Sequence, residues 1–159
     1  MKLRVSLPDQ TLEVLDATGA VLAAYPVSTA ANGAGEERGS YCTPRGRHLI
    51  RAKIGAGLPL NSVLVARRPT GEIYTPDLGT AQPERDWILT RILWLSGKEP
   101  GFNRLGSCDS MGRYIYIHGT PDEAFEQAPR SHGCIRMRNR DLIELFDQVP
   151  VYTPVEVIA

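Results

Sequence analysis

The sequence predicts a single, mainly β domain with one clear helix near residues 140–149. Most of the chain consists of short runs in which apolar and polar residues alternate, separated by turn-forming residues, as in strands joined by tight turns. Only one stretch, close to the C-terminus, has apolar residues at helical spacing. The chain has 159 residues, which is enough for one domain with its own core and too short to predict two. We therefore expect one domain over residues 1–159.

The first third of the chain is expected to be β. Turn-forming residues occur at 8–10 and 17–19, and residues 30–39 are small, polar and glycine-bearing, which predicts a loop. Residues 43–46 predict a turn into a further alternating run. The strands are expected at 3–7, 11–16, 21–27 and 48–54.

The middle of the chain continues this pattern. A turn is expected at 69–71, and the two prolines of the polar stretch 76–85 argue against regular structure there. The run 87–95 is almost continuously apolar, which indicates a strand buried on both faces. A glycine-rich loop is expected at 97–112. The strands of this part are expected at 61–67, 71–74 and 87–95.

The last third contains the helix. Residues 114–117 have high β-propensity and predict a strand that ends at His118. Asn139 is a suitable N-cap for a helix that continues to Pro150, and residues 154–158 form a closing strand. The helical spacing is carried by Leu142, Ile143, Leu145, Phe146 and Val149.

Composition indicates an ordinary soluble globular protein, with 42% hydrophobic and 23% charged residues. The formal net charge is zero, from 18 basic and 18 acidic residues, so the charge balance favours neither nucleic acid nor a membrane surface as partner. No run approaches the ~18 apolar residues of a membrane span. Residues 1–8 alternate like a strand and lack the apolar region of a signal peptide, which predicts either a cytosolic chain or an export sequence already removed.

The chemistry is expected between residues 114 and 137. His118 follows a predicted strand, and Cys134 lies within the motif SHGCIRM. A thiol attacks acyl groups as its thiolate, which needs a nearby imidazole or positive charge because a free cysteine has a pKa near ~8.5. Gly133 allows a sharp turn in which successive amide N–H groups serve as an oxyanion hole. The positive charge expected to lower the thiol pKa comes from Arg130, Arg136, Arg138 and Arg140.

Two other roles remain open from spacing alone. Cysteine is among the most buried residue types, so Cys134 can be a core residue. His118, His132 and Cys134 can also be zinc ligands, although they lack the short paired spacings of a structural site. Thiol catalysis ranks ahead of the structural role, and zinc ranks third. The other two cysteines, Cys42 and Cys108, either pair with each other in an oxidising compartment or are small, half-buried residues.

The HGT at 118–120 and the SHGCIRM at 131–137 resemble the L,D-transpeptidase catalytic domain family, also called the YkuD domain. Residues 41–46 (YCTPRG) resemble its TPxG segment, and residues 86–93 together with 114–120 resemble its central strands. The resemblance extends over nearly the whole chain and implies a β-sandwich-like or barrel-like domain of mixed strands.

The resemblance also implies roles for individual residues. Cys134 is the nucleophile, His118 the base, and the backbone carbonyl of Gly119 orients the imidazole. Ser131, His132 and Gly133 shape the substrate pocket. Arg136 is the candidate for binding a substrate carboxylate, and its alternative role is a structural ion pair with an acid such as Asp141.

The implied function is that of a peptidoglycan L,D-transpeptidase. Cys134 forms an acyl-enzyme from a stem tetrapeptide with release of D-Ala, and an amine then accepts the acyl group. Carbapenems mimic this acyl donor. The alternatives are an L,D-carboxypeptidase with water as acceptor and a non-catalytic peptidoglycan-binding domain. We expect a monomer with peptidoglycan stem peptides as partner, without cofactor, metal, nucleic acid or membrane span. It acts in the periplasm or cell envelope by resemblance, or in the cytoplasm if the native chain starts at Met1.

Overall fold

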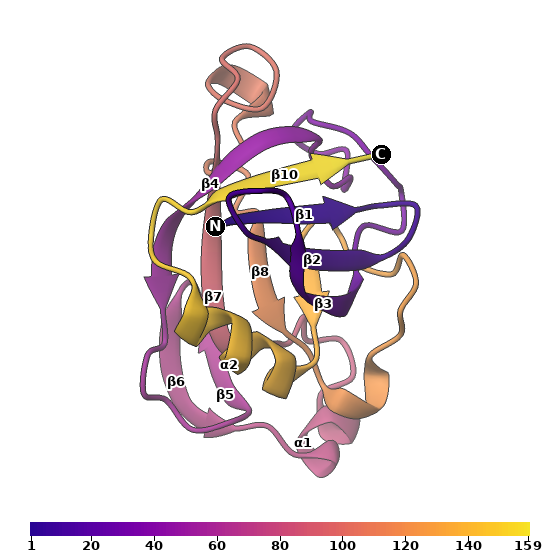
Figure 1. Cartoon of the computed structure of the whole chain (residues 1–159). Coiled ribbons are helices and arrows are strands. Elements are labelled where there is room, and N and C mark those ends of the chain that lie inside the picture. The colour runs from indigo at the N-terminus through magenta and orange to yellow at the C-terminus, as the bar shows by residue number, and fades with distance from the viewer.

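One closed sheet organises the structure, a computed structural model that describes residues 1–159. The ring runs in the order β4-β10-β1-β2-β3-β9-β8-β7, and β7 pairs back with β4 (Figure 1). A hairpin of β5 and β6 extends from β7. The strands are β1 (Lys2–Ser6), β2 (Thr11–Leu15), β3 (Val21–Ser28), β4 (Gly46–Ile54), β5 (Ser62–Val65), β6 (Arg68–Ile73), β7 (Ile88–Gly97), β8 (Tyr116–Gly119), β9 (Ile135–Met137) and β10 (Pro154–Ile158). The predicted mainly β fold of mixed strands is confirmed.

Two parallel pairs make the sheet mixed. β1 pairs with β10 in parallel, and β8 pairs with β9 in parallel with Ile117 opposite Ile135. All other neighbours are antiparallel. A parallel pair needs a long connection between its strands. The connection from β8 to β9 contains the short 3-10 helix η2 (Asp122–Ala124) and the SHGC motif, so the pairing brings the two predicted motifs side by side.

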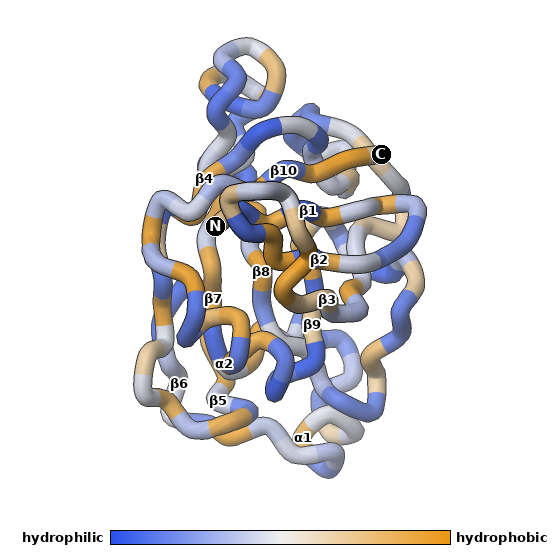
Figure 2. The backbone as a smooth tube through the Cα atoms, in the orientation of Figure 1, coloured by the Kyte–Doolittle hydropathy of each residue, from blue (hydrophilic) through white to orange (hydrophobic).

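The core fills the inside of the ring and its contact with the helix α2 (Asn139–Gln148). Nineteen buried apolar residues form one cluster, to which β1 contributes Leu3 and Val5 and α2 contributes Leu142, Leu145 and Phe146. Figure 2 shows apolar residues along β1, β7 and α2. α2 packs against β7 and β8. Truncating one of these fully buried leucines to alanine costs ~2–5 kcal/mol, so the cluster fixes the strands that carry the motifs.

The structure contains a second α-helix, α1 (Pro76–Ala81), where a loop was expected. In the sequence alone, the two prolines argue against regular structure. Proline is tolerated in the first turn of a helix, however, because the N–H that it lacks would have no intrahelical partner there. Pro76 begins the helix, and the hydroxyl of Thr75 accepts a hydrogen bond from the Leu78 amide at 3.2 Å as the N-cap. The expectation that residues 76–85 lack regular structure was therefore wrong, whereas the clear helix expected near 140–149 is present as α2 (Asn139–Gln148).

The turn of the β5–β6 hairpin also differs from the prediction. It lies at Ala66 and Arg67, which both have positive φ (48° and 63°), and not at 69–71. Two successive residues with positive φ form the two-residue turn that matches the twist of paired strands. Pro69 then lies within β6, where it is tolerated because β6 is the edge strand of the sheet.

Asn139 is not the N-cap of α2. Arg138 holds that position, with extended backbone and no capping hydrogen bond from its side chain. Asn139 is the first helical residue, and its fully buried side chain points back to the segment after β8. The N-cap prediction was wrong because a buried tertiary network uses the amide that would have capped the helix.

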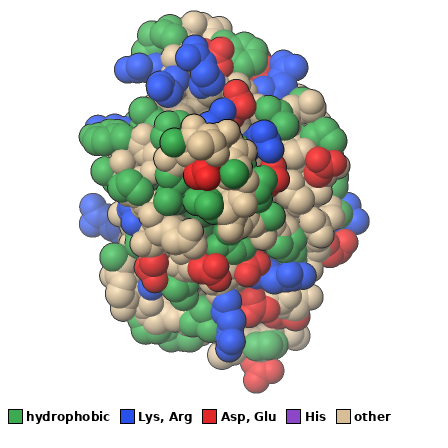
Figure 3. Space-filling view, viewed as in Figure 1, with side chains coloured by type: hydrophobic (Ala, Val, Ile, Leu, Met, Phe, Trp, Pro, Cys, Tyr) green, Lys and Arg blue, Asp and Glu red, His purple; other side chains and the backbone are tan.

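The surface carries both signs of charge. On the face that includes α2, acidic and basic side chains are interspersed, and basic side chains gather over the long loop between β7 and β8 (Figure 3). That loop contains the 3-10 helix η1 (Gly106–Cys108). Neither α-helix of the structure has the length and apolar character needed to cross a membrane.

Candidate active site

The parallel pair β8–β9 places the two motifs on one face of the sheet. His118 lies opposite Arg136 in the register, and Cys134 precedes Arg136 by two residues. Because side chains alternate between the faces of a strand, residues 116, 118, 134 and 136 share one face, and Ile117 and Ile135 point to the core. The predicted nucleophile and base are thus brought together on the outer face of the ring.

A cavity of about 100 Å³ opens at this place. Its lining residues are Asp86, His118, Ser131, His132, Cys134 and Arg136. Five of them were singled out in the sequence, and Asp86 was not. Asp86 precedes β7 with an ordinary loop composition, so no local signal could identify it. The predicted arginines Arg130, Arg138 and Arg140 do not line the cavity.

His118 is held in one tautomer. It is buried, and its Nδ1 lies 2.7 Å from the carbonyl oxygen of Gly119. A carbonyl can only accept, so Nδ1 carries the proton and Nε2 is left with its lone pair as the basic nitrogen. Burial lowers the pKa of His118 below its usual value, an effect that the Gly119 carbonyl partly opposes. The imidazole is therefore neutral at pH 7 and ready to take a proton.

Cys134 is a neutral thiol in this structure. It is half-buried, and burial raises the pKa of its thiol to about 12, although Arg136 and Arg113 act in the opposite direction. Its Sγ lies 3.3 Å from the carbonyl oxygen of Tyr114 and accepts a hydrogen bond from the Tyr116 amide at 3.4 Å. Arg136 lowers the pKa as expected, but the expectation of a lowered thiol pKa was wrong, because the desolvation of the thiol is the larger effect.

Two of the arginines that were expected around Cys134 have other partners. Arg130 forms an exposed ion pair with Glu126 at 3.2 Å, and Arg138 stacks over the ring of Phe125 at 4.9 Å. Only Arg136 reaches the cavity, where its guanidinium lies 3.6 Å from the carboxylate of Asp86. The acid paired with Arg136 is therefore Asp86 and not Asp141, which lies on α2.

The turn before Cys134 is fixed by hydroxyl groups. The Ser131 hydroxyl donates to the carbonyl of Cys134 at 2.6 Å and accepts from the Gly133 amide at 3.2 Å. Gly133 has a φ of 130°, which favours glycine, and its carbonyl accepts from the Thr43 hydroxyl at 2.9 Å. Since the Gly133 amide is occupied, the amides of His132 and Cys134 are the two N–H groups of this turn without a protein acceptor.

A buried network behind His118 was missed in the sequence. The hydroxyl of Thr90 donates to Asn139 Oδ1 at 2.6 Å, and the Asn139 amide donates to the Thr120 carbonyl at 2.8 Å. Thr90 has a φ of 76°, a conformation that is rare for a β-branched residue. Strained residues of this kind cluster at functional sites. The network joins β7, α2 and the residues that follow His118.

Aromatic residues lie close to Cys134, whose Sγ contacts the backbone of Tyr114 and Tyr116. Tyr116 and Tyr114 both lie within 6.0 Å of the Trp94 ring, measured between ring centroids. Arg67, at the tip of the β5–β6 hairpin, stacks over Tyr114 at 4.7 Å and donates to the Tyr116 hydroxyl at 2.9 Å. The hairpin therefore covers the strand that lies beside Cys134.

The structure also shows the state of the other two cysteines and whether a zinc site is formed. All three cysteines are free thiols, with Cys42 half-buried and Cys108 buried, so Cys42 and Cys108 are not paired. Across residues 1–159, no three or more His, Cys, Asp or Glu side chains gather in a metal-binding arrangement. His118, His132 and Cys134 share a cavity without forming a ligand set.

The closed mixed sheet carries one cavity in which Cys134 and His118 lie together. The family model of the L,D-transpeptidase catalytic domain (YkuD) matches residues 2–157. The chain belongs to this family, as its motifs suggested.

Two curated relatives are similar in sequence. The probable L,D-transpeptidase YbiS of Escherichia coli K12 is 46% identical over 131 residues, and the probable L,D-transpeptidase ErfK/SrfK of Salmonella typhimurium LT2 is 35% identical over 133 residues. Each alignment covers 74% of this chain and 40% of the relative. The chain thus matches less than half the length of these relatives.

Solved structures share the fold. Bd1075 of Bdellovibrio bacteriovorus aligns with a TM-score of 0.60 and 17% identity, over 99% of this chain and 47% of its own. L,D-transpeptidase 3 of Mycobacterium tuberculosis, solved with a faropenem-derived adduct, aligns with a TM-score of 0.58 and 17% identity, over 99% and 59% of the two chains. At these low sequence identities, the similarity to the solved structures shows a shared fold and nothing more.

Proposed function

We propose that this domain is a cysteine-dependent peptidoglycan L,D-transpeptidase. Cys134 takes the acyl group of a stem tetrapeptide with release of D-Ala and passes it to an amine. The observation that carries the proposal is the single cavity shared by Cys134 and His118, in which His118 is neutral with Nε2 as its basic nitrogen. Family membership supports the choice of substrate, and the cell envelope is the matching location.

The first half-reaction forms a thioester. Because both groups are neutral at rest, His118 Nε2 takes the thiol proton as the sulfur attacks the carbonyl carbon. The oxyanion is stabilised by the amides of His132 and Cys134, and one such donor can be worth ~3 kcal/mol. The imidazolium of His118 then gives its proton to the nitrogen of the leaving D-Ala. The C–N bond breaks, and the acyl group remains on Cys134.

The second half-reaction returns the thiol. An amine enters the place left by D-Ala and attacks the thioester, His118 takes its proton, and the thiol leaves with that proton. The products are a 3→3 cross-link, a protein attachment or an exchanged D-amino acid. With water as the acceptor the same steps would give an L,D-carboxypeptidase.

Arg136 is proposed to bind the carboxylate of the terminal D-Ala. It shares the cavity with His118, on the side where the leaving amine must lie to receive its proton. Its present partner Asp86 is largely exposed and lies 3.6 Å away, which is a weak pair that a substrate carboxylate can replace. The planar guanidinium suits bidentate binding of a carboxylate.

The test is incubation with purified disaccharide tetrapeptide, with and without a D-amino acid, followed by mass analysis of the products. Cross-linked dimers or D-amino-acid exchange are expected, and Cys134→Ala should abolish both. Cys108→Ala is the matched control, because its thiol lies outside the cavity. Tripeptide as sole product would establish the carboxypeptidase, and no turnover by the folded protein would refute the enzymatic proposal.

A further inference from the structure

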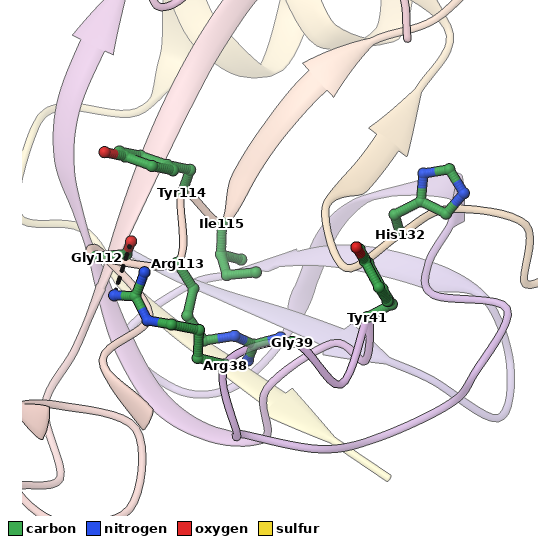
Figure 4. A pocket seen from close by; sticks show the side chains of 8 residues that line it. All are labelled: Arg38, Gly39, Tyr41, Gly112, Arg113, Tyr114, Ile115 and His132. Atoms are coloured by element: carbon green, nitrogen blue, oxygen red, sulfur yellow. Dashed lines mark hydrogen bonds between the residues drawn. The ribbon is translucent and has the colours of Figure 1, made fainter. Parts of the chain in front are cut away.

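A second cavity, of about 240 Å³, lies next to the cavity that holds Cys134 and His118. Figure 4 shows Tyr114 and Ile115 on one side, Tyr41 and His132 on the other, and the arginines Arg38 and Arg113 along one end. His132 lines this cavity and the one that holds Cys134. The carbonyl of Tyr114 is also the group 3.3 Å from Cys134 Sγ. The two cavities therefore adjoin at His132, close to Cys134.

The two tyrosines that form the walls are held in an unfavourable conformation. Tyr41 and Tyr114 have φ values of 56° and 58°, in the left-handed region that non-glycine residues seldom adopt. Both side chains are exposed, at 60% and 51%, although aromatic residues usually gain stability from burial. A backbone held this way costs ~1–3 kcal/mol per residue, and such costs are concentrated at ligand sites. Two exposed, strained tyrosines facing one cavity indicate a binding surface.

Arg38 brings a positive charge without an ion-pair partner to this cavity. It forms no ion pair, and its only side-chain hydrogen bond is a long one, 3.4 Å, to the Gly112 carbonyl. The nearby acid Asp109 is occupied, since its carboxylate accepts from the amides of Leu105 and Gly112, both at 2.7 Å. The free guanidinium donors are therefore available to a ligand.

Arg113 fixes the loop that carries Arg38 and Tyr41. Its guanidinium donates to the carbonyl of Glu36 at 3.0 Å and to the carbonyl of Cys42 at 2.8 Å. These bonds lie on either side of Arg38 in the chain. A rigid loop lowers the entropic cost of presenting a charged side chain to a ligand. The hydrogen bonds of Arg113 thus fix the backbone position of Arg38 in this loop.

The mechanism decides which part of the substrate reaches this cavity. His118 lines only the smaller cavity, so the amine that it protonates leaves there. The acyl part stays on Cys134, and the adjoining cavity leads from there toward Tyr114 and Arg38. We propose that Arg38, Tyr41 and Tyr114 form a binding site for a carboxylate-bearing branch of the acyl donor, an inference that rests on the proposed function. Arg38 binds the carboxylate, and the tyrosine rings pack against the peptide chain.

The experiment compares two donor tetrapeptides in acylation of the full chain. In one, the side carboxylates of the second and third residues are free, and in the other they are amidated. Arg38→Gln should lower kcat/KM about fivefold to tenfold for the free-acid donor and less than twofold for the amidated donor. Arg38→Glu should reverse the preference of the wild type for the acid. Arg51→Gln, at an exposed arginine of β4 without a side-chain partner, is the matched control and should change neither rate.

Each result has a defined meaning. Equal rates of wild-type protein with both donors would overturn the inference and leave the proposed function standing. An equal loss with both donors in Arg38→Gln would show that Arg38 only supports the loop, which also overturns it. Wild-type protein that turned over neither donor would refute the proposed function, and the inference with it.

Discussion

The side chain of Asn139 occupies the space beside Gly119 in which a β-carbon would lie, and the carbonyl of Leu89 closes the same space from β7. Gly119 is therefore restricted to glycine by contact and not by its backbone angles, since its φ is not positive. Its own carbonyl holds His118 Nδ1 at 2.7 Å. Asn139 and Leu89 thus help to fix the position of His118.

Gly119→Ala should therefore displace His118. A methyl group at residue 119 collides with Asn139 and with the Leu89 backbone, so β8 must shift and carry the imidazole with it. We expect kcat/KM for acylation to fall about 100-fold, because displacements on the order of 1 Å have such effects on catalysis. The measurement is acylation kinetics, with thermal unfolding as the check on folding. In the double variant with Asn139→Ala part of the space is restored, so the two losses should be less than additive. Full activity of Gly119→Ala would contradict this account.

The value of kcat/KM for acylation should decrease on the acid side of the pH profile only. The pKa of His118 is lowered below 6.5 by burial, so the base is protonated and inactive only below that pH. The pKa of Cys134 is raised to about 12, so the thiol remains neutral at higher pH. The rate constant kcat/KM should fall as the pH falls below 6.5 and stay level up to about pH 9. A bell-shaped profile with a descending limb before pH 9 would instead indicate a resting thiolate–imidazolium pair.

A second buried histidine should make stability pH-dependent. His48 is fully buried, its Nδ1 donates to the Gly46 carbonyl at 3.0 Å, and its Nε2 accepts from the Ser110 hydroxyl at 2.8 Å. Burial lowers its pKa from 6.5 to about 4. The unfolded chain therefore binds a proton from pH 6.5 downward and the folded one does not, so stability is full above pH 6.5 and decreases toward pH 4. The loss amounts to about 3 kcal/mol.

The measurement is the free energy of unfolding by denaturant between pH 7 and pH 4, for wild type and His48→Gln. His118 contributes a slope of the same sign in this range, so the comparison of slopes is what isolates His48. The variant should be less stable at pH 7 and have a shallower slope. Parallel slopes would show that His48 takes up its proton in the folded state as readily as in the unfolded state.

The sequence by itself determined the strand pattern and the motifs that contain the candidate residues His118 and Cys134. Alternation along 48–54 and the apolar run 87–95 are local properties, and β4 and β7 formed where these patterns occur. The motifs around His118 and Cys134 are also local and could be read without a fold. The errors fell where proline and asparagine have more than one role: Pro76 begins a helix, Pro69 lies in an edge strand, and Asn139 serves a network instead of a cap.

Only the tertiary structure decided how the site is built. The parallel pairing of β8 with β9 sets the register of His118 and Arg136, and it depends on contacts between segments far apart in the chain. The same holds for Asp86 at the cavity and for the loop that carries Arg38 beside Tyr114. The direction of the Cys134 pKa shift also follows from burial, which a sequence does not specify, and not from the arginines next to it in the chain. Periodicity reports which face of a strand is buried, whereas register, desolvation and long-range hydrogen bonds arise only when the strands are assembled.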